Sequence, residues 1–145
     1  MSSFDAIEWS DPMPPPSSDK VAATERLAAF KFPADFLEFC DTFHGGFPDP
    51  DEIEVVGFGR TMINQVLPFD DDEEESIRSI GTVFAAVEGL PEGLVPFASE
   101  PGGNYFCFSA GHTGDMEIVF WFHEENRVLP VCGTFSEFVE LISES

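Results

Sequence analysis

Positively charged side chains are scarce in this sequence. Its 145 residues include six Lys plus Arg against 28 Asp plus Glu, which gives a formal net charge of −22. Proteins that bind nucleic acid use cationic side chains to replace counterions at the phosphates, and anionic membranes attract the same side chains. We therefore expect neither a nucleic-acid nor a membrane partner, whereas a basic protein would be attracted. The alternative is that the acidic surface only keeps the protein soluble.

Long apolar runs and a basic leader are also missing. No stretch approaches the ~18 consecutive apolar residues of a membrane helix, and the first residues lack the basic start and apolar core of a signal peptide. Cysteines are few and odd in number, with Cys40, Cys107 and Cys132 each inside an apolar run. This pattern is typical of buried thiols in a reducing compartment and not of a disulfide framework. The expected location is the cytoplasm.

Hydrophobic residues, in contrast, are abundant. They make up 43% of the chain, and 17 of them are Phe. Wholly disordered chains are poor in aromatic residues, so this composition excludes that class. A chain of this length falls in the size range of one domain and buries roughly 68–70% of its unfolded surface, which is enough for a core without disulfides.

The prolines divide the chain into two parts. Residues 1–17 contain Pro12 and a run of three prolines, which remove backbone donors and disfavour a helix. We expect this segment to be an extended, loosely attached arm, although Phe4, Ile7 and Trp9 could dock it onto the body. Residues 18–145 are predicted to form a single domain.

Helical patterns begin directly after the arm. The first predicted helix covers residues 18–30, with Ala23, Leu27 and Phe30 on its apolar face. The second begins at Pro33 and ends before two glycines, which adopt the left-handed C-terminal conformation easily. Its apolar positions recur at i, i+3, i+4 and i+7, namely Phe36, Phe39, Cys40 and Phe43.

The remainder of the chain has mainly strand patterns. A third helix is predicted over about residues 76–87, and a fourth follows Thr134, which can cap it. Short apolar runs between Gly, Pro and Asn turns predict strands at 53–58, 61–67, 94–98, 104–108, 117–123 and 128–132. The predicted fold class is α+β, with a mostly antiparallel sheet and helices packed on one side of it.

Residues that could support catalysis are few. Cys40 and His44 are four residues apart on the second helix, but a thiol on an apolar helix face is more often an inert part of the core. No second pair at ligand spacing accompanies them to make a zinc site. The glycines of residues 101–104 are followed by neither Lys nor a helix, so they predict a tight turn and not a phosphate loop. We expect no enzymatic activity, no cofactor and no metal.

The acidic residues are densest between Asp49 and Glu75, where ten acids face one base, Arg60. If these side chains gather on one face, their field would steer a cationic partner. The alternative is that the acids are only solvated and point in different directions. The candidate partner-binding residues are Asp49, Asp51, Glu52, Glu54, Asp70, Asp71, Asp72, Glu73, Glu74 and Glu75.

Five short motifs together resemble the SUKH superfamily, bacterial immunity proteins related to a fungal cell-wall assembly regulator. Residues 32–39 (FPADFLEF) with the later His-Gly-Gly resemble the LP-x-x-(Y/F)-x-x-F…NGG signature of that superfamily. The other motifs follow in the order of the superfamily, at residues 94–98, 102–108, 118–124 and 134–138. Two positions depart from the pattern: His44 replaces the usual Asn, and Glu100 stands where Asp is common.

The resemblance implies a SUKH-like α+β fold and a function by protein binding. Many members of the superfamily neutralise a cognate toxin, often a nuclease, that a neighbouring bacterial cell delivers. The leading hypothesis is therefore an immunity protein that binds a basic, nuclease-type toxin domain. The alternative is a cytoplasmic regulatory or scaffolding module of the same fold without a toxin partner. An enzyme built on this fold is the third class.

Overall fold

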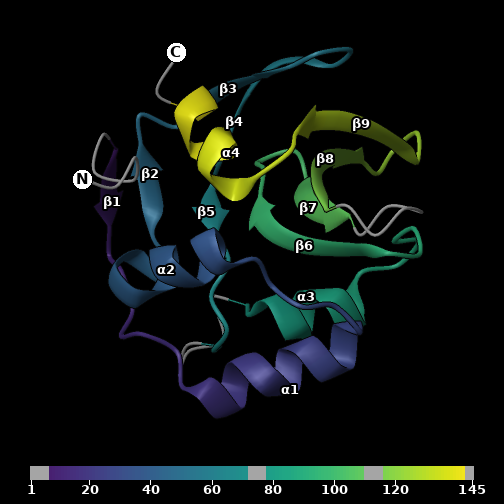
Figure 1. Cartoon of the computed structure of the whole chain (residues 1–145). Coiled ribbons are helices and arrows are strands. Elements are labelled where there is room, and N and C mark those ends of the chain that lie inside the picture. The colour runs from purple at the N-terminus through teal and green to yellow at the C-terminus, as the bar shows by residue number, and fades with distance from the viewer. Residues whose placement is uncertain (1–6, 72–77, 110–115, 143–145) are drawn as a thin grey trace.

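Four helices and nine strands form within the residues that the computed structural model describes, which are 7–71, 78–109 and 116–142 (Figure 1). The helices are α1 (Ser18–Ala28), α2 (Ala34–Phe43), α3 (Ile80–Ala86) and α4 (Phe135–Ile142). The strands are β1 (Glu8–Ser10), β2 (Phe47–Asp49), β3 (Glu52–Val55), β4 (Gly59–Met62), β5 (Gln65–Val66), β6 (Leu94–Ser99), β7 (Tyr105–Ser109), β8 (Glu117–Phe122) and β9 (Arg127–Cys132).

All strand pairs in this part of the chain are antiparallel. The main sheet has the order β5-β6-β7-β8-β9, and the pairs β1-β2 and β3-β4 form two smaller sheets. The predicted α+β class with a mostly antiparallel sheet is confirmed. Pro96 lies in an internal strand, where it cannot donate a ladder hydrogen bond, and the register of β6 against β7 shifts between Pro96 and Ala98.

The main sheet is apolar on both faces. One face carries Phe97, Phe106, Phe108 and Phe120 into a large core that also contains the buried residues of α2 and α4. The opposite face forms a smaller buried cluster that packs with the segment following α3. Its members are Leu94, Cys107, Val119 and Trp121, together with the partly buried Val87, Leu90 and Tyr105. α2 and α4 thus pack on the same side of the sheet, as predicted.

α2 follows its predicted pattern closely. Phe36, Phe39 and Cys40 are buried, and Gly45 after the helix has a φ of +71°, in the left-handed region that glycine adopts without strain. The start of α2 also connects to α4 across the fold. The carboxylate of Asp35 accepts hydrogen bonds from Ser136 N at 2.9 Å and from Ser136 Oγ at 3.0 Å, so it satisfies a free donor at the beginning of α4.

The first and third helices differ from prediction. Ala23 and Leu27 are exposed, and the buried residue of α1 is Thr24. α1 packs against α3, where Leu27 Cδ2 and Thr24 Oγ1 lie 3.5 and 3.9 Å from the position that a Cβ of Gly81 would occupy. α3 begins at Ile80 and not near residue 76, because Ser79 caps it: Ser79 Oγ accepts from Thr82 N at 3.1 Å.

The N-terminal arm is not loosely attached from Ile7 to Met13. β1 pairs with β2, and Ile7 and Trp9 are buried. The Trp9 ring meets Phe39 of α2 edge-on at a centroid distance of 4.7 Å, and Met13 N donates to His44 O at 2.7 Å. The segment is extended, as its prolines predict, but burial of the large Trp9 indole fixes it to the body of the domain. Phe4 lies outside the described residues.

Phe36 generates the first prediction. It is fully buried, so Phe36→Ala should lower the free energy of unfolding by about 3–5 kcal/mol, through lost transfer energy and the cavity left behind. Denaturant titration measures this change. Phe43→Ala on the same helix is the matched control and should cost less, because Phe43 is only partly buried. An unfolding midpoint for Phe36→Ala equal to that of the unmodified protein would contradict the role given to this ring.

Candidate functional site

Four of the ten candidate acids lie around the turn from β2 to β3. Asp49 ends β2 and Asp51 precedes β3. Glu52 and Glu54 are exposed and alternate with the two buried residues of β3, so both carboxylates lie on the outer side of the β3–β4 hairpin. These four acids are near one another in the fold.

The other candidate acids that can be placed lie elsewhere. Asp70 Oδ1 is 3.7 Å from Lys20 Nζ of α1. Asp71 holds the start of α3, because it accepts from Ser79 N at 2.7 Å and from Thr82 Oγ1 at 3.0 Å. α1 and α3 form the end of the molecule opposite β3 (Figure 1), so the structure does not gather the candidate acids on one face. Outside the described residues lie Asp72, Glu73, Glu74 and Glu75.

The cationic side chains are unevenly distributed. Two of the six, Arg60 of β4 and Arg127 of β9, are each within 4 Å of a glutamate, at 3.8 Å from Glu52 and 3.3 Å from Glu125. The other four lie on α1 or directly beside α1 and α3, namely Lys20, Arg26, Lys31 and Arg78. The acids of β3 and α4 therefore share their end of the fold only with arginines that already contact a carboxylate.

Cys40 and His44 do not form a catalytic pair. His44 is fully buried, and its two ring nitrogens contact other groups: Nδ1 lies 2.8 Å from Pro14 O, and Nε2 accepts from Phe69 N at 2.7 Å. Since Nε2 is an acceptor, Nδ1 carries the proton and donates it to Pro14 O. Burial lowers the pKa of His44 below its ordinary 6.5, against smaller opposing effects of this hydrogen bond and of Asp70.

Residues 101–104 form the predicted tight turn, and a buried polar network around Glu100 holds it in place. Gly103 N donates to Glu100 O at 3.0 Å, which closes the predicted tight turn. Glu100 Oε1 accepts from Gly102 N at 2.7 Å and from Asn104 Nδ2 at 3.0 Å, and Glu100 Oε2 accepts from Thr61 Oγ1 of β4 at 2.5 Å. The carboxylate is therefore used to anchor the β3–β4 hairpin to the main sheet.

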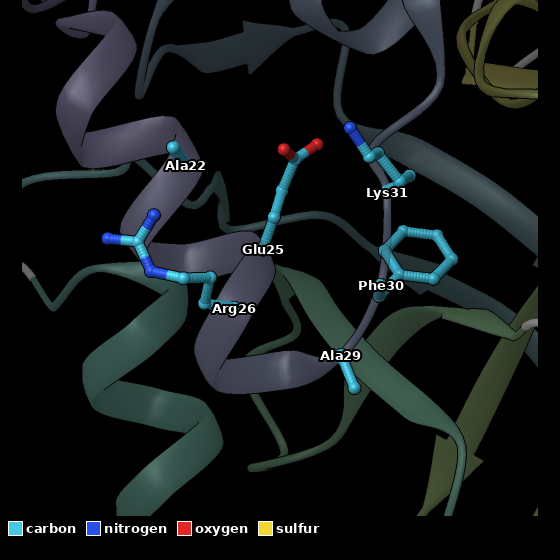
Figure 2. Close-up of a pocket in the computed structure, with 6 residues that line it drawn as sticks. All are labelled: Ala22, Glu25, Arg26, Ala29, Phe30 and Lys31. Carbon is cyan, nitrogen blue, oxygen red and sulfur yellow. The ribbon is translucent and has the colours of Figure 1, made fainter.

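A hollow beside the end of α1 is the first concave feature (Figure 2). Glu25 Oε2 accepts from Phe32 N at 2.9 Å, and Arg26 and Lys31 project on opposite sides of Glu25 (Figure 2). The charges in this hollow are mixed and do not converge on one point, so we assign no ligand to it. Its lining residues are Ala22, Glu25, Arg26, Ala29, Phe30 and Lys31.

A second hollow lies between β9 and α4. It is a groove of about 440 Å³ lined by Val131, Cys132, Glu137, Glu140 and Leu141, and we call it the α4–β9 groove. Sequence reasoning missed this groove. One feature of the sequence could have indicated it: Leu141 is apolar but lies outside the helical spacing of the buried residues of α4.

The described residues show two further properties. None of the helices in this part of the chain has the length and apolar content needed to span a membrane. Within the same residues, no three His, Cys, Asp or Glu side chains are grouped so that they could hold a metal ion.

His44 generates a prediction about pH. In the unfolded chain the imidazole takes up a proton at its ordinary pKa near 6.5, whereas in the folded protein it resists protonation. Stability due to neutral His44 is therefore present above pH 6.5 and decreases as the pH falls below that value. We expect the difference in urea midpoint between the unmodified protein and His44→Asn to narrow from pH 7.5 to pH 5.5. A difference that stays constant over this range would contradict the buried neutral imidazole.

The cysteines generate a prediction about thiol reactivity. All three are free; Cys40 and Cys107 are buried as expected, whereas Cys132 is only partly buried. Burial, followed by the charge of Glu137, raises the pKa of the Cys132 thiol from 9.0 to about 12. An uncharged thiol reagent should modify Cys132 first, with a rate that rises with pH because the thiolate is the nucleophile. Cys132→Ser should remove the fast phase, and a second fast thiol in native protein would contradict the assignment.

The family of the chain follows from one comparison. The model of the SMI1 / KNR4 family (SUKH-1) matches residues 15–141, which is most of the chain and extends from the end of the arm into α4. A comparison with curated proteins finds no match. The matched region includes α2 with the glycines that end it and the turn anchored by Glu100. It also includes the predicted cap of α4, where Thr134 Oγ1 accepts from Glu137 N at 3.1 Å. The chain therefore belongs to the SMI1 / KNR4 family (SUKH-1) of the SUKH superfamily.

Proposed function

We propose that this protein is an immunity protein that binds a basic, nuclease-type toxin domain and blocks its active site. The single observation that carries the proposal is the uneven charge: a chain of net charge −22 keeps four of its six cations beside α1 and α3. A nuclease carries positive charge where it holds phosphates, so an acidic surface can occupy that site as a mimic of nucleic acid.

The mechanism is binding and not catalysis. Long-range attraction between the acids around β3 and a basic active site would accelerate association, and apolar contacts would then slow dissociation. Cys40 and His44 contribute to the core and to the attachment of the arm, which leaves them no catalytic role in this proposal. The cytoplasm is the proposed location, because free thiols persist in a reducing compartment.

The test begins with the genes adjacent to that of this protein, one of which should encode the toxin domain. Purified protein should form a one-to-one complex with the toxin domain and abolish its cleavage of nucleic acid. Coexpression should restore growth to cells that express the toxin domain. A toxin that stays active at an equimolar concentration of this protein would contradict immunity. Binding without inhibition would instead fit the regulatory or scaffolding module.

A charge variant tests the steering surface within that complex. Glu52→Gln with Glu54→Gln should slow association several-fold at low salt, and the difference should vanish near 1 M salt, where the Debye length falls to about 3 Å. Glu88→Gln with Glu92→Gln is the matched control, since both glutamates are exposed and follow α3. Equal slowing by the two variants would show that only net charge matters.

A further inference from the structure

The α4–β9 groove combines apolar and acidic groups in one place. Leu141 is 36% exposed, whereas the other large apolar residues of α4 are buried in the core. Val131 of β9 lines the same groove, and Leu129, two residues earlier, is like Val131 partly buried against the large core. Leu129 Cδ2 is 3.4 Å from the position that a Cβ of Gly57 would occupy, at the tip of the β3–β4 hairpin. An apolar strip therefore runs from α4 along β9 to the hairpin.

The groove is also electronegative. Glu137 and Glu140 line it, and its described lining contains no lysine or arginine. Burial raises the pKa of the Cys132 thiol most, and the negative charges of Glu137 and Asp35 raise it further. Four of the six cations lie at the opposite end of the fold, beside α1 and α3. An apolar side chain flanked by positive charges is the chemistry that fits these walls.

We propose that the α4–β9 groove docks a cationic amphipathic segment of a partner protein, with an apolar side chain against Val131 and Leu141 and Lys or Arg beside Glu137 and Glu140. A second copy of the chain does not fit, because the groove would then receive a chain of net charge −22. The inference rests on the proposed function for the class of partner, a basic protein, and it adds the contact surface that such a partner would use.

Cys132 provides a reporter inside the groove. The probe is a synthetic peptide of alternating Lys and Leu, compared with a Lys–Ser peptide that lacks the apolar side chains and a Glu–Leu peptide of opposite charge. Modification of Cys132 by an uncharged thiol reagent is followed by mass spectrometry at low salt. With the Lys–Leu peptide at about ten times its measured Kd, about a tenth of the groove stays free, so labelling should slow about tenfold. The two control peptides, at the same concentration, should leave the rate nearly unchanged.

Two leucines form a matched pair of variants. Leu141→Lys places a cation in the groove and should abolish protection of Cys132 by the Lys–Leu peptide. Leu27→Lys changes a leucine on α1 that is 53% exposed, and it should leave the protection intact. Thermal melting of both variants checks that they fold. The comparison of the three peptides on the unmodified protein stays decisive even where a variant does not fold.

Several results would overturn the inference. These are the absence of saturable Lys–Leu binding, binding that leaves Cys132 labelling unchanged, equal protection by the Glu–Leu peptide, and equal loss of protection in Leu27→Lys. The assay contains no toxin, so its failure would leave the proposed function in place with a different contact surface. A toxin that is not inhibited, together with protection of Cys132 by the peptide, would reject immunity and retain the groove as a binding site.

Discussion

The packing of the Phe36 ring is the constraint on which the rest of this structure depends. Its centroid lies 5.0 to 6.3 Å from those of six other rings, most of them tilted or edge-on, which is the geometry that aromatic quadrupoles favour. These rings come from α2 and its preceding loop, the segment after β5, strands β6 and β7, and α4, and they are Phe32, Phe39, Phe69, Phe97, Phe108 and Phe135. A single buried ring thus connects segments that are up to a hundred residues apart in the chain.

The position of α2 determines two polar connections. At its start, Asp35 accepts from the first turn of α4, and after its end, His44 joins the arm at Pro14 to the segment at Phe69. Both contacts require α2 to be held in place by its aromatic face, because the buried imidazole and the partly buried carboxylate stabilise the fold only when their hydrogen-bond partners are in place. With α4 held in this way, its outer surface faces β9, and the α4–β9 groove is the result.

The charge distribution and the packing of the core both support the proposed binding of a basic protein. Among the described residues, the acids lie outside the aromatic core except for Glu100, whose buried carboxylate accepts hydrogen bonds from Thr61, Gly102 and Asn104. β3 and α4 pack against this core through their buried residues, and their glutamates lie outside it. An acidic surface on packed elements, next to an apolar strip, suits the proposed recognition of a basic protein, since the backbone of such elements needs little ordering on binding.

The sequence by itself determined the class of the fold, α2 with the glycine that ends it, the capped start of α4 and strands β6 to β9 of the main sheet, because each is set by local periodicity and turn chemistry. The single strand predicted over 61–67 is wrong, because the chain forms β4 and the separate β5 there. Its acidity and motifs are also the basis of the proposed class of partner, a basic protein. Only the tertiary structure decided that Trp9 binds the arm to α2, that Thr24 and not Leu27 is buried in α1, and that Asp71 accepts from Ser79 and Thr82 at the start of α3, far from Glu52. It also placed Leu141 beside Val131, which no spacing in the sequence predicts. These outcomes depend on which elements meet in space, and that choice is made by burial of aromatic area across the whole chain and not by any local pattern.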